Sequence, residues 1–169
     1  MTRKTIVAAC MSVAALLSAC QFGETSTTAK TDVSEGPTVA AATQIEAGWY
    51  LVRIGGCNDC HTPQYAMTGG AQPPESEWLK GSNEPHTGPW GTSYGKNLRL
   101  TVAGRSEDEW VELLNTGTSL PPMPWPSVRA MSEADQRAVY QYIKSLPGDP
   151  GQPSPVPLPP GAIPPAPGA

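Results

Sequence analysis

Two cysteines and a histidine occur within five consecutive residues, in the order Cys57-Asn58-Asp59-Cys60-His61. Two thiols separated by two residues can add to the two vinyl groups on one edge of a haem. The adjacent histidine then lies under the iron, with a ring nitrogen free to bind it. The spacing therefore predicts one covalently attached haem c, held by Cys57 and Cys60 and ligated by His61. A chain of 169 residues must fold around so large an apolar group, so this motif constrains the fold more than any other feature.

Other uses of a close cysteine pair account for the motif less well. A thioredoxin-like dithiol follows a βαβ sequence pattern, which this chain lacks. A zinc site needs four ligands, and no second cysteine pair of this spacing is present. A disulfide across two intervening residues would leave His61 without a role. Haem attachment is the prediction, and these three uses are the alternatives.

The first twenty residues have the pattern of an export signal. Two basic residues precede an apolar stretch from residue 6 to residue 19, which is shorter than the ~20 residues that span a bilayer. The end of the stretch, Leu17-Ser18-Ala19-Cys20, resembles the lipobox of bacterial lipoproteins. The resemblance implies a signal peptide at 1–19 and acylation of Cys20, and ordinary cleavage that leaves a free thiol is the alternative. We expect an exported lipoprotein on the periplasmic side or at the outer membrane, stably anchored by two or more acyl chains.

Processing of this kind changes both the cysteine count and the charge. Cys10 leaves with the signal peptide and Cys20 carries lipid, so Cys57 and Cys60 are the only pair left. The net charge of −4 for the whole sequence becomes −6, because nine basic and fifteen acidic residues remain. An acidic protein of this kind is not expected to bind nucleic acid, since that requires a basic surface that displaces counterions. The same charge predicts redox partners with basic patches.

Composition divides the remaining chain into three parts. Residues 20–43 follow the signal peptide and are rich in Thr, Ser and Ala, which predicts a flexible tether behind the lipidated cysteine. Residues 44–147 carry the periodic apolar segments and form the predicted domain. Residues 148–169 contain nine prolines, which disfavour helix and sheet. We predict a disordered, solvated tail of polyproline II character, and a docking role in Pro-rich recognition is the alternative.

Three segments of the domain have apolar residues at helical spacing and recognisable ends. These predicted helices cover 44–54, 106–117 and 132–147. The second begins with a capping box, in which Ser106 precedes Glu109 by three positions. Residues 62–105 are rich in Gly and Pro and predict mostly irregular structure, with a short helix near 76–80. No strand pattern appears, so the expected fold class is all-α.

A haem iron has a second axial position, for which the sequence offers Met67, His86, Met123 and Met131. Four prolines surround Met123 between residues 120 and 126, and they fix the backbone angles of a loop that can hold a weak thioether ligand. Met67 follows His61 too closely to reach the opposite face of the haem with ease. Met131 directly precedes the last predicted helix, which favours packing, and His86 has the setting of a surface loop residue. We therefore predict Met123 as the sixth ligand.

Residues 47–146 resemble a class I cytochrome c domain. The likeness rests on residues 55–63 around the cysteines, on Gly88-Pro89-Trp90-Gly91 and on Pro122-Met123-Pro124-Trp125-Pro126. These stretches are similar to those of small periplasmic cytochromes c related to the cytochrome subunits of bacterial dehydrogenases. The resemblance implies a cytochrome c fold, with three to four short helices around one covalently attached haem. It also implies His61 and Met123 as the axial ligands.

The resemblance implies further contacts within such a domain. The first and last helices are expected to cross, with Trp49 and Val52 against Val139, Tyr140 and Ile143. The Pro89 carbonyl is expected to accept a hydrogen bond from the His61 ring. The expected contacts to the haem propionates are Trp90, Tyr94, Asn97 and Arg99.

A haem with protein ligands on both axial positions has no place for a substrate, and its chemistry is the transfer of one electron. We therefore predict a membrane-tethered electron carrier and not an enzyme. Its expected partners are an exported dehydrogenase or another cytochrome on one side, and an acceptor such as a terminal oxidase on the other. The sequence has only two histidines and no evident paired carboxylates or nucleophile triad for acid–base catalysis. The alternative is a haem enzyme, a peroxidase or a small-molecule reductase, with a displaceable sixth ligand.

Overall fold

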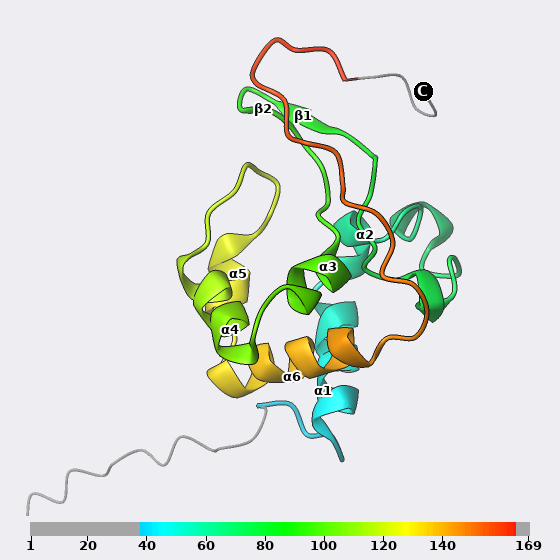
Figure 1. The fold of residues 1–169 in the computed structure, drawn as a ribbon, viewed down its shortest axis with the longest axis vertical. Helices are drawn as coiled ribbons and strands as arrows, with labels where there is room; N and C mark the ends of the chain where they lie inside the picture. Colours follow the sequence, from blue (N-terminus) through cyan, green and yellow to red (C-terminus); the bar gives the residue numbers. More distant parts are fainter. Residues whose placement is uncertain (1–37, 165–169) are drawn as a thin grey trace, which may run out of the picture. The chain divides into compact units, whose positions relative to one another are not determined.

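The computed structural model describes residues 38–164. The expected signal peptide, Cys10, the acylation site at Cys20 and the tether up to residue 37 lie outside the described residues. The secondary structure of the described part is mostly helical, with one small sheet (Figure 1). The helices are α1 (Gln44–Ile54), α2 (Cys57–His61), α3 (Leu98–Ala103), α4 (Glu107–Thr116), α5 (Trp125–Arg129) and α6 (Glu133–Ser145). Two 3₁₀ helices (Ala66–Thr68 and Glu75–Glu77) and two strands, β1 (His86–Gly88) and β2 (Gly91–Ser93), complete the structure.

The three long helices lie where the sequence predicts them, and their ends have the predicted chemistry. At the start of α4 the Ser106 hydroxyl accepts from the Glu109 N–H (3.3 Å), and the Glu109 carboxylate accepts from the Ser106 N–H (2.7 Å). This pair confirms the capping box. Ser132 caps α6 by accepting from the Asp135 N–H (3.1 Å). None of the helices within residues 38–164 has the length and apolar character needed to cross a bilayer.

Helices α1 and α6 cross near their middles (Figure 1). A Cβ atom on Gly48 would overlap the Ala138 carbonyl oxygen and the Tyr142 Cβ, so the two backbones touch where only glycine fits. The other expected crossing residues are buried in the shared core: Val52, Val139, Tyr140 and Ile143. The expectation for Trp49 is wrong, because α1 turns Gly48 toward α6 and leaves Trp49 with 36% of its surface exposed.

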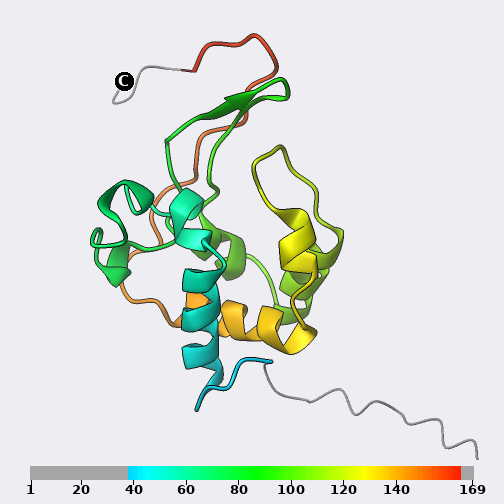
Figure 2. The same cartoon turned by 180° about the vertical axis from the view of Figure 1, so that it is seen from behind.

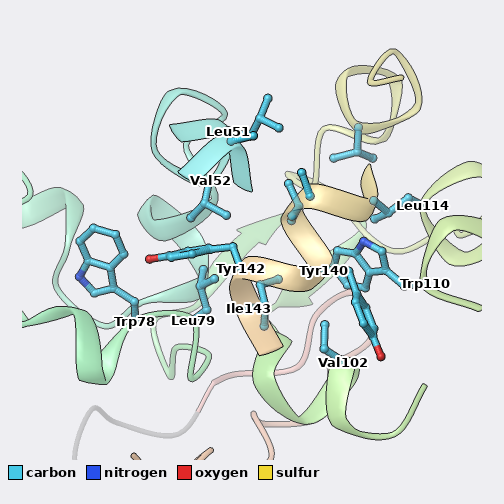
Figure 3. Packing of buried hydrophobic residues seen from close by; sticks show 14 residues of the cluster. Leu51, Val52, Trp78, Leu79, Val102, Trp110, Leu114, Tyr140, Tyr142 and Ile143 are labelled. Atoms are coloured by element: carbon cyan, nitrogen blue, oxygen red, sulfur yellow. The ribbon is translucent and has the colours of Figure 1, made fainter. Parts of the chain in front are cut away.

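The core continues from this crossing toward α3 and α4 (Figure 3). Tyr142 is buried beside Val52 and Leu79, and its hydroxyl donates to Glu75 Oε1 (2.8 Å). On the other side of α6, Trp110 is buried and donates its indole N–H to the Gln136 carbonyl (3.0 Å). Both aromatic residues thus bury a large apolar area while their polar atoms keep a partner.

Several elements are too short for a sequence pattern to indicate. The strands β1 and β2 have three residues each and pair antiparallel, and α3 and α5 have six and five residues. The expectation of a helical fold is confirmed, whereas the expected three to four helices without strands are corrected to six helices and a small sheet in the described part. The helix expected near 76–80 is limited to the 3₁₀ turn at Glu75–Glu77, because Trp78 already has an extended backbone.

Residues 148–158 of the expected tail run past α3 and the sheet (Figure 2). Leu158 forms an antiparallel bridge with Thr92 of β2, with both N–O distances at 2.9 Å. The expectation of a tail solvated throughout is corrected for residues 150–158, because prolines lack donors but keep carbonyls that accept hydrogen bonds. Disorder of the tail stays a prediction. Residues 165–169 lie outside the described part.

Candidate cofactor site

The C-x-x-C-H motif forms the short helix α2. It follows Gly56, whose φ of +64° is a left-handed conformation that glycine adopts without strain. At the other end, Thr62 Oγ1 donates to Asn58 Oδ1 (2.7 Å) and accepts from the Leu79 N–H (2.8 Å). Thr62 and Asn58 are both buried, so these bonds are protected from water. The motif is thereby fixed at both ends by local chemistry.

The His61 ring is oriented by one backbone carbonyl. Its Nδ1 lies 2.7 Å from the Lys96 oxygen, and since a carbonyl only accepts, Nδ1 carries the hydrogen. Nε2 is then the nitrogen with a free lone pair, the form in which imidazole binds a metal. Burial lowers the pKa of His61, which keeps the ring neutral. The expectation that Pro89 supplies the acceptor is wrong, because the chain brings Lys96 to the ring instead.

The two thiols of the motif are half-buried and free in this structure. Burial raises the pKa of Cys57 to about 11, and burial also raises the pKa of Cys60, with the Asp59 carboxylate adding to both. A reactive thioredoxin-like dithiol requires the opposite shift, toward the thiolate. No group of three His, Cys, Asp or Glu side chains within residues 38–164 has the arrangement of an ion site, so the zinc alternative gains no support.

A cavity of about 240 Å³ opens beside the motif. This volume far exceeds the ~30 Å³ share of one water molecule, so the cavity has room for a larger organic group. Helix α2 lies on one side, and the 117–124 loop with α5 lies on the other (Figure 1). Cys57, Cys60 and His61 line it together with Met123, so residues far apart in the sequence meet there. Its apolar wall is formed by Val52, Leu98, Trp110, Leu113, Leu114, Leu120, Trp125, Val128 and Val139.

Of the four candidates for a sixth ligand, the structure places three on the cavity wall and one away from it. Met67 is 81% exposed and is not part of the cavity wall. Met123, Met131 and His86 all line the cavity. Met123 is half-buried against the core, and its loop is held at Pro121, whose carbonyl accepts from the Ser93 hydroxyl of β2.

Of the four residues expected to contact propionates, only Tyr94 lies on the cavity wall. Arg99 instead donates to the carbonyls of Trp78 (2.7 Å), Pro147 (2.6 Å) and Glu75 (3.0 Å), so its guanidinium joins α3 to the turn at residues 75–78 and to the end of the segment after α6. The other two residues also act elsewhere. Asn97 caps α3 and bonds the tail, and the Trp90 ring lies against Gly88 in the β-turn.

Three basic side chains on the cavity wall were not predicted as contacts of a bound group. His86, Lys96 and Arg105 line the cavity, and its lining within the described residues includes no Asp or Glu. His86 Nε2 is buried, with no partner among residues 38–164. A sequence gives no direct signal for such a set, because its members come from a strand, a loop and a helix end. The arrangement suits a ligand with an apolar body and carboxylate groups.

The cavity therefore combines two thiols, a neutral histidine and a thioether in an apolar setting, with the basic residues His86, Lys96 and Arg105 also on its lining. Comparison with known proteins adds no identification, since no family model, curated protein or solved structure matches the chain.

Proposed function

We propose that this protein is a one-electron carrier with a single haem c. Cys57 and Cys60 would hold the haem through two thioethers, each made by adding a thiol across one vinyl group, and His61 Nε2 and Met123 Sδ would ligate its iron. The observation that carries the proposal is that one cavity is lined by both cysteines and the histidine of the C-x-x-C-H motif and by the proline-framed Met123. When bound, the haem iron supplies the Fe(II)/Fe(III) couple.

The residues around the cavity fit that group. The hydrogen bond to Lys96 leaves His61 Nε2 as the ligating atom. The apolar residues of α4 and α5 that line the cavity would exclude water from a bound haem. His86, Lys96 and Arg105 offer donors to propionate carboxylates, and no carboxylate side chain on the wall opposes them. The fold that we propose for residues 44–147 is that of a class I cytochrome c, whose first and last helices cross as α1 and α6 do.

Two protein ligands on the iron leave no place for a substrate, which favours electron transfer over catalysis. The competing function is a haem enzyme, and the observation that favours it is the buried, unpartnered His86 Nε2 on the cavity wall. An imidazole in that position could move a proton if Met123 left the iron. We propose the carrier because the cavity wall also holds Met123 in a loop framed by prolines.

The proposal includes the cellular setting. Export with acylation at Cys20 would tether the domain to a membrane through residues 20–43. The carrier would then exchange electrons with a dehydrogenase or cytochrome and with a downstream acceptor by short-lived encounters.

The test is a spectrum of the full-length protein made with a haem-attachment system. We expect a mass increase of one haem that survives denaturation, and a ferric Met–iron charge-transfer band. Met123→Ala should keep the covalent haem, lose that band and lower the reduction potential by on the order of hundreds of millivolts, because axial ligands set potential over about 0.8 V.

Met67→Ala is the matched control, since Met67 is exposed and lies off the cavity wall. This variant should change neither the charge-transfer band nor the reduction potential. A high-spin ferric spectrum without the band in the unaltered protein, together with peroxidase activity lost in His86→Ala, would favour the enzyme. Absence of covalent haem would reject both functions.

A further inference from the structure

We propose that residues 148–158, which we call the strap, position the axial ligand His61 of the proposed haem site. The inference rests on the proposed function and gives a role to a segment whose composition suggests a dispensable tail. The strap contacts the chain directly on both sides of Lys96, the residue whose carbonyl holds the His61 ring.

The first strap contact lies after Lys96. Asn97 Nδ2 donates to the carbonyls of Pro150 (2.7 Å) and Gln152 (3.0 Å), and Asn97 is buried. Both hydrogens of one side-chain amide are therefore committed to the strap. The same side chain caps α3 by accepting from the Leu100 N–H (3.0 Å). Asn97 thus joins the strap, α3 and the segment that carries Lys96.

The second strap contact lies before Lys96. Ser154 Oγ donates to the Gly95 carbonyl (2.8 Å), which also accepts from the Ser82 N–H (2.9 Å). A Cβ on Gly95 would overlap the Cys60 carbonyl oxygen, so this backbone packs directly on α2. Lys96 is therefore held between two residues that the strap bonds, and its carbonyl has little freedom to move away from the ring.

A third contact ties the strap to the Met123 side of the cavity. Leu158 pairs with Thr92 of β2, and the next residue of that strand, Ser93, donates from its hydroxyl to the Pro121 carbonyl. Pro157 lies in the strap between Ser154 and Leu158, and it lines the cavity itself. The strap thus lies beside β2, which is hydrogen-bonded to the loop that contains Met123. Its residue Pro157 forms part of the cavity wall.

The surface beneath the strap is shaped to receive it. A Cβ on Gly91, whose φ is +103°, would overlap the Leu158 carbonyl oxygen, and one on Gly81, whose φ is +86°, would overlap Ser154 Oγ. Both glycines adopt a left-handed backbone that other residues rarely adopt. A tail that lay in solvent would not need glycines at positions 81 and 91 to leave space for its atoms.

The chemical consequence follows from the bond between His61 Nδ1 and Lys96. A histidine whose Nδ1–H donates to a well-fixed carbonyl is a stronger electron donor at Nε2, and it keeps one ring orientation. Loss of the strap should free Lys96 to move and admit water where Pro157 now lines the cavity. The reduction potential and the exchange rate of the Nδ1 hydrogen should therefore both depend on the strap.

The experiment compares four forms of the haem-loaded protein. These are the full chain, a chain that ends at Pro147, Asn97→Asp in the full chain, and Asn97→Asp in the shortened chain. Aspartate keeps the oxygen that caps α3 but lacks the two hydrogens that bind the strap. The matched controls are Asn83→Asp, which makes the same charge change at an exposed residue, and a chain that ends at Pro164.

We expect the shortened chain and Asn97→Asp to shift the potential in the same direction. Each should speed exchange of the His61 Nδ1 hydrogen, followed by NMR in the ferrous protein, by about tenfold. In the shortened chain Asn97→Asp should add little further change, because its partner is already gone. Both controls should match the full chain.

Two outcomes overturn the inference: an unchanged potential and exchange rate in the shortened chain, or an Asn97→Asp effect of equal size with and without the strap. Failure of the proposed function is a separate result, since it would appear as a full chain without covalent haem. Folding losses in the shortened chain do not obscure the answer, because Asn97→Asp in the full chain tests the same contact with the strap present.

Discussion

At the scale of single residues, Gly95 allows the segment that carries Lys96 to pack directly on α2. The space where its Cβ would lie is occupied by the Cys60 carbonyl oxygen, with the Cys60 carbonyl carbon and His61 Cα close by. The segment that carries Lys96 can approach α2 only because residue 95 has no side chain. The hydrogen bond from His61 Nδ1 to Lys96 depends on this approach.

Gly95→Ala should therefore destabilise the domain and reduce haem attachment. Overpacking of a closely packed site costs about 1–3 kcal/mol, and here the clash is with backbone that cannot turn aside. Urea unfolding and the yield of covalent haem measure the two effects. Gly104→Ala is the control, because its nearest atom, the Leu100 oxygen, would lie 3.5 Å away in ordinary contact. Equal stability of the two variants would contradict the prediction.

The sequence predicts the four residues that would hold the proposed haem, and the structure brings them to one cavity. Cys57, Cys60 and His61 are identified by spacing alone, and Met123 by its prolines. The acceptor for His61 could not be found in this way, because any residue has a backbone carbonyl and Lys96 has no distinguishing side chain for that role. Arg99 illustrates the opposite error, since the resemblance implied a contact to a propionate while the fold buries it among three carbonyls.

At the scale of elements, the crossing of α1 and α6 depends on the small residue at position 48. Helix propensity alone predicts that Gly48→Ala stabilises α1 by about 1 kcal/mol. The overlap of the new Cβ with the Ala138 carbonyl and Tyr142 forces the helices apart, at a cost of about 1–3 kcal/mol or more. The net effect should be destabilisation, measured as a lower urea midpoint. A higher urea midpoint would show that the two helices can move apart without loss of stability.

The capping box of α4 predicts a pH dependence. Hydrogen bonds from the Ser106 backbone and side chain hold the pKa of Glu109 below its ordinary value of 4.5. Because the folded pKa is the lower one, the stabilisation is fully present above the unfolded pKa and is lost as pH falls through the folded pKa. Glu109→Gln keeps a hydrogen-bonding group without a titrating one.

The thermal midpoint of the unaltered protein should therefore fall toward that of Glu109→Gln as the pH is lowered from about 5 to about 3. Thermal unfolding followed by circular dichroism at several pH values measures the difference. A difference in thermal midpoint between the unaltered protein and Glu109→Gln that does not change with pH would exclude this role for the Glu109 carboxylate.

Elements with their own local chemistry could be predicted, and elements fixed by tertiary contacts could not. α1, α4 and α6 have apolar periodicity together with caps or stops. The strands β1 and β2 have three residues each, too few for an alternation to appear. The tail was misjudged for a related reason: its prolines exclude regular ladders, but its carbonyls meet Asn97 and Thr92.

At the scale of the whole molecule, charge governs encounters with redox partners. Removal of the expected signal peptide leaves a charge of −6, and the haem propionates would add to it. Long-range attraction between unlike charges raises association rates by about 10- to 1,000-fold at low salt and is screened as salt increases.

Oxidation of the reduced protein by two small complexes of opposite charge tests this prediction. The rate with a cationic oxidant should fall about tenfold or more as ionic strength rises from low values to ~0.15 M, whereas the rate with an anionic oxidant should rise. Stopped-flow absorbance measures both rates. Equal salt dependence for the two oxidants would show that the site of electron exchange does not experience the net charge.

The position of the strap in the chain has a consequence for biosynthesis. Pro157 is the last residue along the sequence that lines the cavity, so this part of the cavity wall is made after all the others. A chain that terminated before residue 148 would carry the C-x-x-C-H motif and Met123 but would lack Pro157 and the strap's bonds to Asn97, Gly95 and Thr92. Every residue of the proposed attachment site can therefore be present in a truncated product whose cavity wall is incomplete.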